Sequence, residues 1–145
     1  MFEVRVEADF SAAHFLKDYN GKCENLHGHN YKVYAHVRGS RLNEGGMLLD
    51  FTKLKEALRA VCKELDHTNL NDFPYFKQNP SAERIAMYIY DGIVSRLKED
   101  GIELSGNASS GESASSCAGA TSGAPKLYSI DVFETDTSRA RYIAD

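Results

Sequence analysis

The chain has 145 residues, of which 42% are hydrophobic and 26% charged, a balance that favours a single globular domain. Its net charge of −4 argues against a protein that holds nucleic acid by phosphate contacts, because such a protein needs a basic face. No apolar run approaches the roughly 20 residues of a membrane span, and residues 1–5 do not resemble a signal peptide. The three cysteines are an odd number, so we expect free thiols and a cytoplasmic protein.

Two segments of alternating polarity predict the first two strands. In residues 2–10, apolar side chains alternate strictly with charged ones, the pattern of a strand with one buried face. If the alternation continues, Ala12 and His14 point to that same face. The second strand is expected over about residues 27–38, where one face carries His27, His29, Tyr31, Val33, Ala35 and Val37.

Apolar residues at helical spacing predict two helices in the middle of the chain. The first spans roughly residues 52–65, and Asp50 and Thr52 are both candidates for its cap. The second begins near Ser81, a good N-cap after a proline, and ends before Gly101. The expected buried stripes are Leu54, Leu58, Val61, Cys62 and Leu65 in the first helix, and Ile85, Ala86, Ile89, Ile93 and Leu97 in the second.

The C-terminal third combines a biased segment with two further strands. Sixteen of the twenty-one residues in 105–125 are Ser, Gly or Ala, so this stretch cannot bury enough surface to order itself, and we expect a flexible insert. Alternation then predicts a strand over residues 128–134 and a last short strand near residues 141–143. The inner face expected for the first of these two strands carries Tyr128, Ile130, Val132 and Glu134. The element order indicates one α+β domain over residues 1–145.

His27 and His29 are the sharpest local feature of the sequence. Residues i and i+2 of a strand share a face, so both imidazoles project side by side, and His14 is expected on the same face of a neighbouring strand. Three imidazoles with one open position are typical of a catalytic zinc site. The alternative is that one or more of them are buried, hydrogen-bonded core residues. His36 is out of phase with the pair and is not assigned to the metal site.

Cys23 lies four residues before His27, in the loop that leads into the histidine strand. A nearby metal or protonated histidine would favour its thiolate form and so a chemical role. A fourth metal ligand and a passive buried thiol are the alternatives. Cys62 falls on the apolar stripe of the first helix, and Cys117 lies in the insert, so neither is assigned a function.

Three acidic residues and one further histidine are candidate site residues. Asp66 and His67 follow the first helix directly and are candidates for a proton relay, although a histidine at a helix C-terminus also interacts with the helix dipole. Glu134 on an inner face needs a partner or a ligand, and a carboxylate matches the N–H/NH₂ edge of a pterin or guanine by two hydrogen bonds. The alternative for Glu134 is a residue at a strand end that reaches solvent. Glu83, near the start of the second helix, is a further candidate, although its interaction with the helix dipole explains it equally well.

Taken together, these segments resemble the 6-pyruvoyltetrahydropterin synthase family. The matching stretches are residues 10–14 (FSAAH), 23–31 (CENLHGHNY), 65–71 (LDHTNLN), 79–83 (NPSAE) and 133–135 (FET). The resemblance covers nearly the whole chain apart from residues 105–125, which depart from a short family member. Each motif is modest alone, and five of them in the right order make a specific match.

The resemblance implies particular roles for the candidate residues. It implies zinc on His14, His27 and His29, catalytic roles for Cys23, Asp66 and His67, a pterin ring anchored by Glu134, and a further contact from Glu83. It also implies the tunnelling fold, in which antiparallel sheets of several subunits close into a barrel. Members are commonly homohexamers with active sites between subunits, so we expect a homo-oligomer, a small pterin substrate, and no nucleic-acid or membrane partner.

The short spacing from Cys23 to His27 resembles the queuosine-pathway branch, 6-carboxy-5,6,7,8-tetrahydropterin synthase. This resemblance implies conversion of 7,8-dihydroneopterin triphosphate to 6-carboxytetrahydropterin, with release of acetaldehyde and triphosphate. The negative net charge is compatible with this substrate, because a local basic rim can receive the triphosphate. Three alternatives stay open: a pyruvoyl synthase that eliminates triphosphate, an aldolase-like relative, and a non-enzymatic zinc-binding scaffold.

Overall fold

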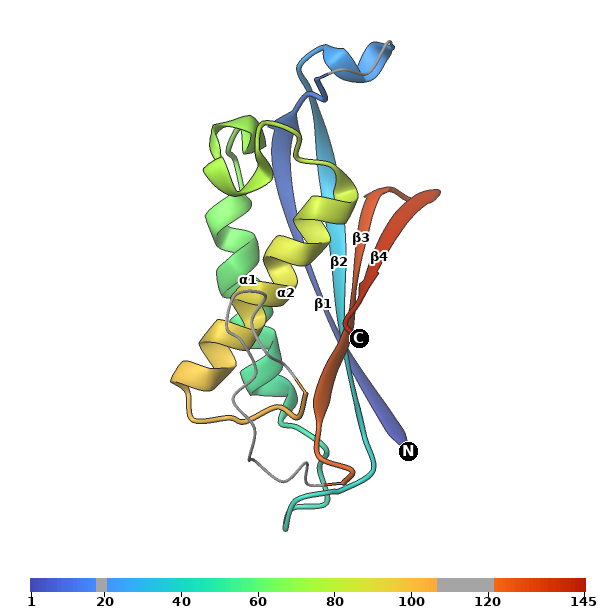
Figure 1. The fold of residues 1–145 in the computed structure, drawn as a ribbon, viewed down its shortest axis with the longest axis vertical. Helices are drawn as coiled ribbons and strands as arrows, with labels where there is room; N and C mark the ends of the chain where they lie inside the picture. Colours follow the sequence, from blue (N-terminus) through green and yellow to red (C-terminus); the bar gives the residue numbers. More distant parts are fainter. Residues whose placement is uncertain (18–20, 107–121) are drawn as a thin grey trace.

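A four-stranded antiparallel sheet, covered on one face by two helices, makes up the fold (Figure 1). The computed structural model describes residues 1–17, 21–106 and 122–145. The strands are β1 (Phe2–His14), β2 (His27–Gly39), β3 (Lys126–Thr135) and β4 (Ser138–Ile143), in the order β1-β2-β3-β4. The helices are α1 (Phe51–Leu65) and α2 (Ala82–Glu99), and the short 3-10 helices are η1 (Lys22–Glu24), η2 (Leu70–Asp72) and η3 (Pro74–Phe76). Neither α1 nor α2 is long and apolar enough to cross a membrane.

The core lies between the helices and the inner face of the sheet. The inner face of β1 carries Val6 and Phe10, and that of β2 carries Tyr31 and Val33, all of which are buried. The apolar stripes predicted for both helices are buried as well, which confirms the helical spacing. Burying each large apolar side chain contributes about 1.5–3 kcal/mol, so this interface between helices and sheet is the main source of stability.

Side-chain caps fix where the helices begin. Asp50 is the N-cap of α1, because its Oδ1 accepts a hydrogen bond from the Thr52 backbone N–H at 2.8 Å. This settles the choice between the two predicted caps. Ser81 caps α2 as predicted, with its Oγ accepting from the Arg84 backbone N–H at 3.3 Å. Both contacts satisfy N–H groups that the first turn of a helix leaves without partners.

The C-terminal strands differ from the prediction in two respects. Tyr128 does not lie on the inner face of β3, because the pairing with β2 shifts between His36 and Val37 and places Leu127 there instead. The Tyr128 ring lies outside the core, 3.5 Å from the Arg38 guanidinium carbon. Strand β4 begins at Ser138, three residues earlier than expected, because Thr135 and Ser138 already pair across a two-residue turn.

The biased segment is described only at its two ends. The Ser105 N–H donates to the Pro125 carbonyl at 2.8 Å, and the Ser40 N–H donates to the Gly123 carbonyl at 2.9 Å. Residues 107–121, which include Cys117, lie outside the described residues, so the expected flexibility of the insert is not tested. Within the described part of the chain, β1 and β4 are the two edges of the sheet.

Candidate metal centre and active site

The three predicted metal ligands meet at one end of the first two strands. His14 ends β1 and pairs directly with His27 at the start of β2, and Ala12 pairs with His29. All three imidazoles therefore stand on the inner face, as the strand phase predicts. The fully buried Tyr31 packs beneath them, with its ring centroid 6.0 Å from that of His14 and 5.5 Å from that of His29.

Glu134 on β3 completes this group. Its Oε1 lies 3.0 Å from His14 Nε2 and 2.9 Å from His29 Nε2, and His14 Nε2 lies 3.0 Å from His27 Nε2. The four potential ligand atoms all lie within 4.8 Å of one another. Three nitrogens and one carboxylate oxygen therefore converge on a common point, and the sequence analysis had placed only the three histidines there.

In His14 and His27, a hydrogen bond at Nδ1 determines that Nε2, the nitrogen that faces the other ligand atoms, bears a lone pair. His14 Nδ1 lies 2.9 Å from the Pro80 carbonyl, and His27 Nδ1 lies 2.6 Å from the Asn25 carbonyl. A carbonyl oxygen only accepts, so both Nδ1 atoms carry the proton, and in a neutral ring Nε2 then bears a lone pair. This is the usual arrangement of a metal-ligating histidine, whose second nitrogen donates to a carbonyl or carboxylate.

The close approach of these side chains brings together lone pairs and negative charge that a cation would stabilise. Two Nε2 lone pairs 3.0 Å apart, together with an ionised carboxylate, repel one another. His29 Nε2 is buried and makes no hydrogen bond, although Glu134 Oε1 is only 2.9 Å away. Buried polar atoms normally have partners, so this nitrogen without a hydrogen bond fits the role of a metal ligand.

The charge states of the group also suit a metal ion. Burial lowers the pKa of His29, which favours the neutral imidazole, although Glu134 acts in the opposite direction. A proton on the surrounding imidazoles, that on His14 first, holds the pKa of Glu134 below its ordinary value despite partial burial, and a cation held by the neutral rings would act on this carboxylate in the same direction. Neutral imidazoles and an ionised carboxylate are the forms that bind divalent metals, and this set of ligands suits zinc.

Asp66 and His67 form a second cluster at the end of α1. Asp66 Oδ1 accepts from the Ser11 backbone N–H at 2.8 Å, and Oδ2 lies 2.8 Å from His67 Nδ1. The bond from Ser11, followed by that from His67, holds the pKa of Asp66 below its ordinary value. His67 has a φ of 55°, a left-handed conformation that is uncommon for residues other than glycine. Its side chain is 82% exposed, so the anchored carboxylate presents the imidazole outward.

Two hollows bring candidate residues together. Glu83 lines one of about 200 Å³ with Glu134 and His14, so both predicted substrate-binding carboxylates border the metal group. His67 and His29 line another of about 510 Å³ at the outer edge of β1. The structure therefore places Asp66 and His67 beside the histidine strands, although the two residues are far from them in the sequence.

Cys23 occupies η1, the short helix in the loop between the two histidine strands. Its side chain is partly buried and the thiol is free. The ligand group formed by the described residues does not include it, which leaves the thiol available for a role other than metal binding. Cys62 is buried, and burial raises the pKa of its thiol to about 12, which suits the passive role expected for it.

His36 lies on the opposite face of the sheet, as its strand phase predicts. Its Nδ1 lies 3.0 Å from Glu3 Oε1 and its Nε2 lies 3.0 Å from Asp131 Oδ2. Arg141 donates to the same aspartate from β4, through Nε at 2.6 Å. This cluster ties four strands together away from the metal group, and the sequence analysis did not identify it.

Comparisons with known proteins agree with this geometry. The family model described as 6-pyruvoyl tetrahydropterin synthase matches residues 3–145. A 6-carboxy-5,6,7,8-tetrahydropterin synthase of Synechocystis is 34% identical over 149 residues, covering 99% of this chain and 95% of the relative. A 6-pyruvoyl tetrahydrobiopterin synthase of Drosophila melanogaster is 49% identical over 84 residues, covering 54% of this chain and 50% of the relative.

A solved structure extends the likeness to the fold. The 6-pyruvoyl tetrahydropterin synthase of Caenorhabditis elegans superposes with a TM-score of 0.73 at 25% identity, covering 99% of this chain and 96% of that one. Sequence and backbone fold therefore both match this family over nearly the whole chain. The chain belongs to the 6-pyruvoyl tetrahydropterin synthase family, a family of enzymes that act on pterins.

Proposed function

We propose that this protein is a zinc-dependent 6-carboxy-5,6,7,8-tetrahydropterin synthase. It would convert 7,8-dihydroneopterin triphosphate and one water molecule to 6-carboxytetrahydropterin, acetaldehyde and triphosphate, a step of deazapurine and queuosine synthesis. The observation that carries the proposal is the convergence of the unprotonated nitrogens of His14 and His27 with His29 and Glu134. The relative that matches almost end to end bears the name of this enzyme, which favours the carboxy branch.

The proposed chemistry divides between the two clusters. His14, His27 and His29 would hold the zinc ion, which when bound supplies Lewis acidity toward the oxygens of the substrate side chain. The Cys23 thiolate removes a proton from that side chain. His67, whose Nδ1 lies 2.8 Å from the Asp66 carboxylate, donates a proton to the substrate side chain from the side opposite Cys23. Solvent then returns His67 to its resting form.

Recognition of the pterin is assigned to the carboxylates beside the metal group. Glu134 accepts two parallel hydrogen bonds from the N–H/NH₂ edge of the ring, and Glu83 makes a further contact from the start of α2. The lowered pKa of Glu134 supports this role, because only the ionised carboxylate accepts both bonds.

The active site is proposed to be completed by neighbouring subunits of a homohexamer. The exposed His67 and the two sheet edges, β1 and β4, support this assembly in the described part of the chain. Paired edges would close several sheets into a barrel and would bring the Asp66–His67 pair of one chain to the metal group of another.

Product analysis tests the proposal. The zinc-loaded protein is incubated with 7,8-dihydroneopterin triphosphate, and pterins and acetaldehyde are measured by mass spectrometry. We expect 6-carboxytetrahydropterin and acetaldehyde in equal amounts. Triphosphate released without acetaldehyde would identify a pyruvoyl synthase, which the local similarity to the Drosophila enzyme favours as the second candidate. A substrate that stays intact would contradict both and favour a zinc-binding scaffold.

A further inference from the structure

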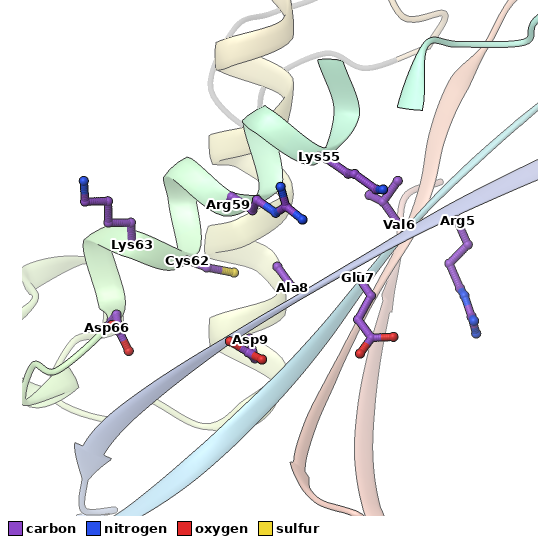
Figure 2. Close-up of a pocket in the computed structure, with 10 residues that line it drawn as sticks. All are labelled: Arg5, Val6, Glu7, Ala8, Asp9, Lys55, Arg59, Cys62, Lys63 and Asp66. Atoms are coloured by element: carbon purple, nitrogen blue, oxygen red, sulfur yellow. The ribbon is translucent and has the colours of Figure 1, made fainter. Parts of the chain in front are cut away.

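Asn71, in η2, uses its side-chain amide to hold two segments of backbone near the metal group. Figure 2 shows Asp66 where α1 ends, and η2 follows a few residues later, beside the end of β1. The Phe15 N–H donates to Asn71 Oδ1 at 2.9 Å. Asn71 Nδ2 donates to the Phe15 carbonyl and to the Gln78 carbonyl, each at 2.9 Å. One amide therefore bonds both backbone polar groups of Phe15 and also reaches a second segment.

The first of these segments follows a metal ligand directly. The Phe15 N–H belongs to the planar peptide that joins Phe15 to His14, so its bond to Asn71 also restrains the backbone of His14. The next N–H, that of Leu16, donates to the Cys23 carbonyl at 2.7 Å. The backbone that Asn71 holds is therefore bonded to the short helix that carries the proposed catalytic thiol.

The second segment is a strained turn over residues 77–80. Lys77 has a φ of 49° and Gln78 a φ of 66°, so two consecutive residues other than glycine adopt the left-handed conformation. Such residues cost free energy and persist only where the surrounding contacts hold them. The turn ends at Pro80, whose carbonyl accepts a hydrogen bond from His14 Nδ1 at 2.9 Å. The strain therefore lies in the segment that orients a metal-ligating ring.

Two side chains from neighbouring elements hold this turn in place. Arg84, in the first turn of α2, donates through Nη1 to the Phe76 carbonyl at 2.7 Å, just before the turn. Asn71 donates to the Gln78 carbonyl within the turn. Of these two side chains, Asn71 is the one that also bonds the backbone after His14, so it joins both supports of that ligand.

We propose that Asn71 is a positioning residue of the metal group, an inference that rests on the function proposed above. It restrains His14 from two directions, at the backbone through Phe15 and at the ring through the turn that presents the Pro80 carbonyl. Partners behind a metal ligand fix its orientation and raise the affinity for the metal. Through the backbone after His14, Asn71 also sets the position of the Cys23 segment relative to the metal.

The test compares wild type with Asn71→Ala in the full-length protein. Competition with a chromophoric chelator should show zinc bound about tenfold more weakly, at the lower end of the effect of losing a direct partner of a ligand. With Co(II) in place of zinc, the visible absorption should change, because the His14 ring loses its fixed orientation. Hydrogen exchange of the Phe15 amide should be faster in the variant, which checks the bond to Asn71 itself.

Asp50→Ala is the matched control for a general loss of stability. Asp50 caps the opposite end of α1, a helix of 15 residues that is roughly 22 Å long. Loss of a cap destabilises the fold, so both variants should have a lower Tm, but Asp50→Ala should keep the zinc affinity and cobalt absorption of the wild type. If Asn71→Ala does not fold, the milder truncation Asn71→Ser should still weaken zinc binding about threefold.

Kinetics at saturating zinc measure the position of the thiol relative to the metal. Asn71 does not belong to the described residues that line the two hollows of the site. Asn71→Ala should therefore keep the KM for 7,8-dihydroneopterin triphosphate within about threefold of the wild type, while kcat falls about tenfold. A higher KM with an unchanged kcat would contradict a positioning role.

Zinc binding separates a failure of this inference from a failure of the proposed function. An unchanged zinc affinity in folded Asn71→Ala would overturn the inference alone, whatever its kcat. A wild type that binds zinc but does not turn over the pterin would contradict the proposed function, and the zinc affinity of Asn71→Ala would still decide the role of Asn71. A wild type that binds no zinc would contradict both.

Discussion

Glu134→Gln is the most informative single substitution, because Glu134 borders both the metal group and the proposed pterin site. In the structure its Oε1 lies 3.0 Å from His14 Nε2 and 2.9 Å from His29 Nε2. Glutamine keeps the size of the side chain but removes its charge and turns one acceptor into a donor. We therefore expect weaker metal binding and weaker pterin binding in the same variant.

The magnitude follows from what remains after the substitution. Three imidazoles still converge in the variant, so the protein should still bind one zinc ion when zinc is supplied in equimolar amount, although more weakly. Loss of a supporting carboxylate at a metal site typically costs about 10–100-fold in metal affinity, which corresponds to about 1.4–2.8 kcal/mol. Loss of one of two parallel hydrogen bonds to the pterin edge, with two donors then facing each other, adds a separate penalty to pterin affinity.

Competition with a chromophoric chelator measures the zinc affinity of wild type and variant, and fluorescence titration with neopterin measures pterin affinity. Glu83→Gln is the matched control, because Glu83 lines the same hollow but does not belong to the ligand group. It should keep wild-type zinc affinity. A Glu134→Gln protein with unchanged zinc affinity would refute the reasoning about the metal group, and unchanged neopterin affinity would refute the pterin role.

Three further predictions concern stability, catalysis and the insert. Asp131→Asn should lower the free energy of unfolding at pH 7 by about 3 kcal/mol in urea titrations, because a carboxylate that is 5% exposed loses bonds from Arg141 and His36. Burial alone would raise the pKa of Asp131, but these partners outweigh burial and lower the pKa. The difference in stability between wild type and variant should therefore vanish as the pH falls through that lowered pKa. Equal stabilities of the two proteins at pH 7 would contradict the argument. Cys23→Ala should keep its zinc and lose about 10²–10⁴-fold in turnover, whereas loss of zinc would make Cys23 a ligand. Replacing residues 107–121 by a short Gly-Asn turn should leave Tm and kcat/KM nearly unchanged, because Ser105 and Pro125 already bond at 2.8 Å, and a tenfold fall in kcat/KM would place the insert in the active site.

The sequence predicts the features of this fold that depend on local periodicity. The phase of β1 and β2 places His14, His27 and His29 on one face and His36 on the other, because alternation along a strand needs no knowledge of its neighbours. The helices are equally local, since a capping residue and an apolar stripe define each one. The correct order of strands and helices follows from these signals.

The sequence fails where the outcome depends on contacts between distant segments. The outward turn of Tyr128 results from a shift in pairing with β2, which no alternation in β3 alone can indicate. The partners of His14 and His27 are the backbone carbonyls of Pro80 and Asn25, and a carbonyl carries no residue-specific signal. Glu134 was predicted on the correct face, but its reach to the histidines depends on the sheet bringing β3 beside β2.

The central claim is that three histidines hold a catalytic metal, and metal analysis of His27→Ala tests it most directly. His27 Nε2 faces His14 Nε2 at 3.0 Å, so its removal leaves an incomplete set of nitrogen ligands. Purified wild-type protein should contain about one zinc per chain, and His27→Ala, with the same fold by circular dichroism, should contain almost none and show no turnover. Stoichiometric zinc in purified His27→Ala would contradict the account.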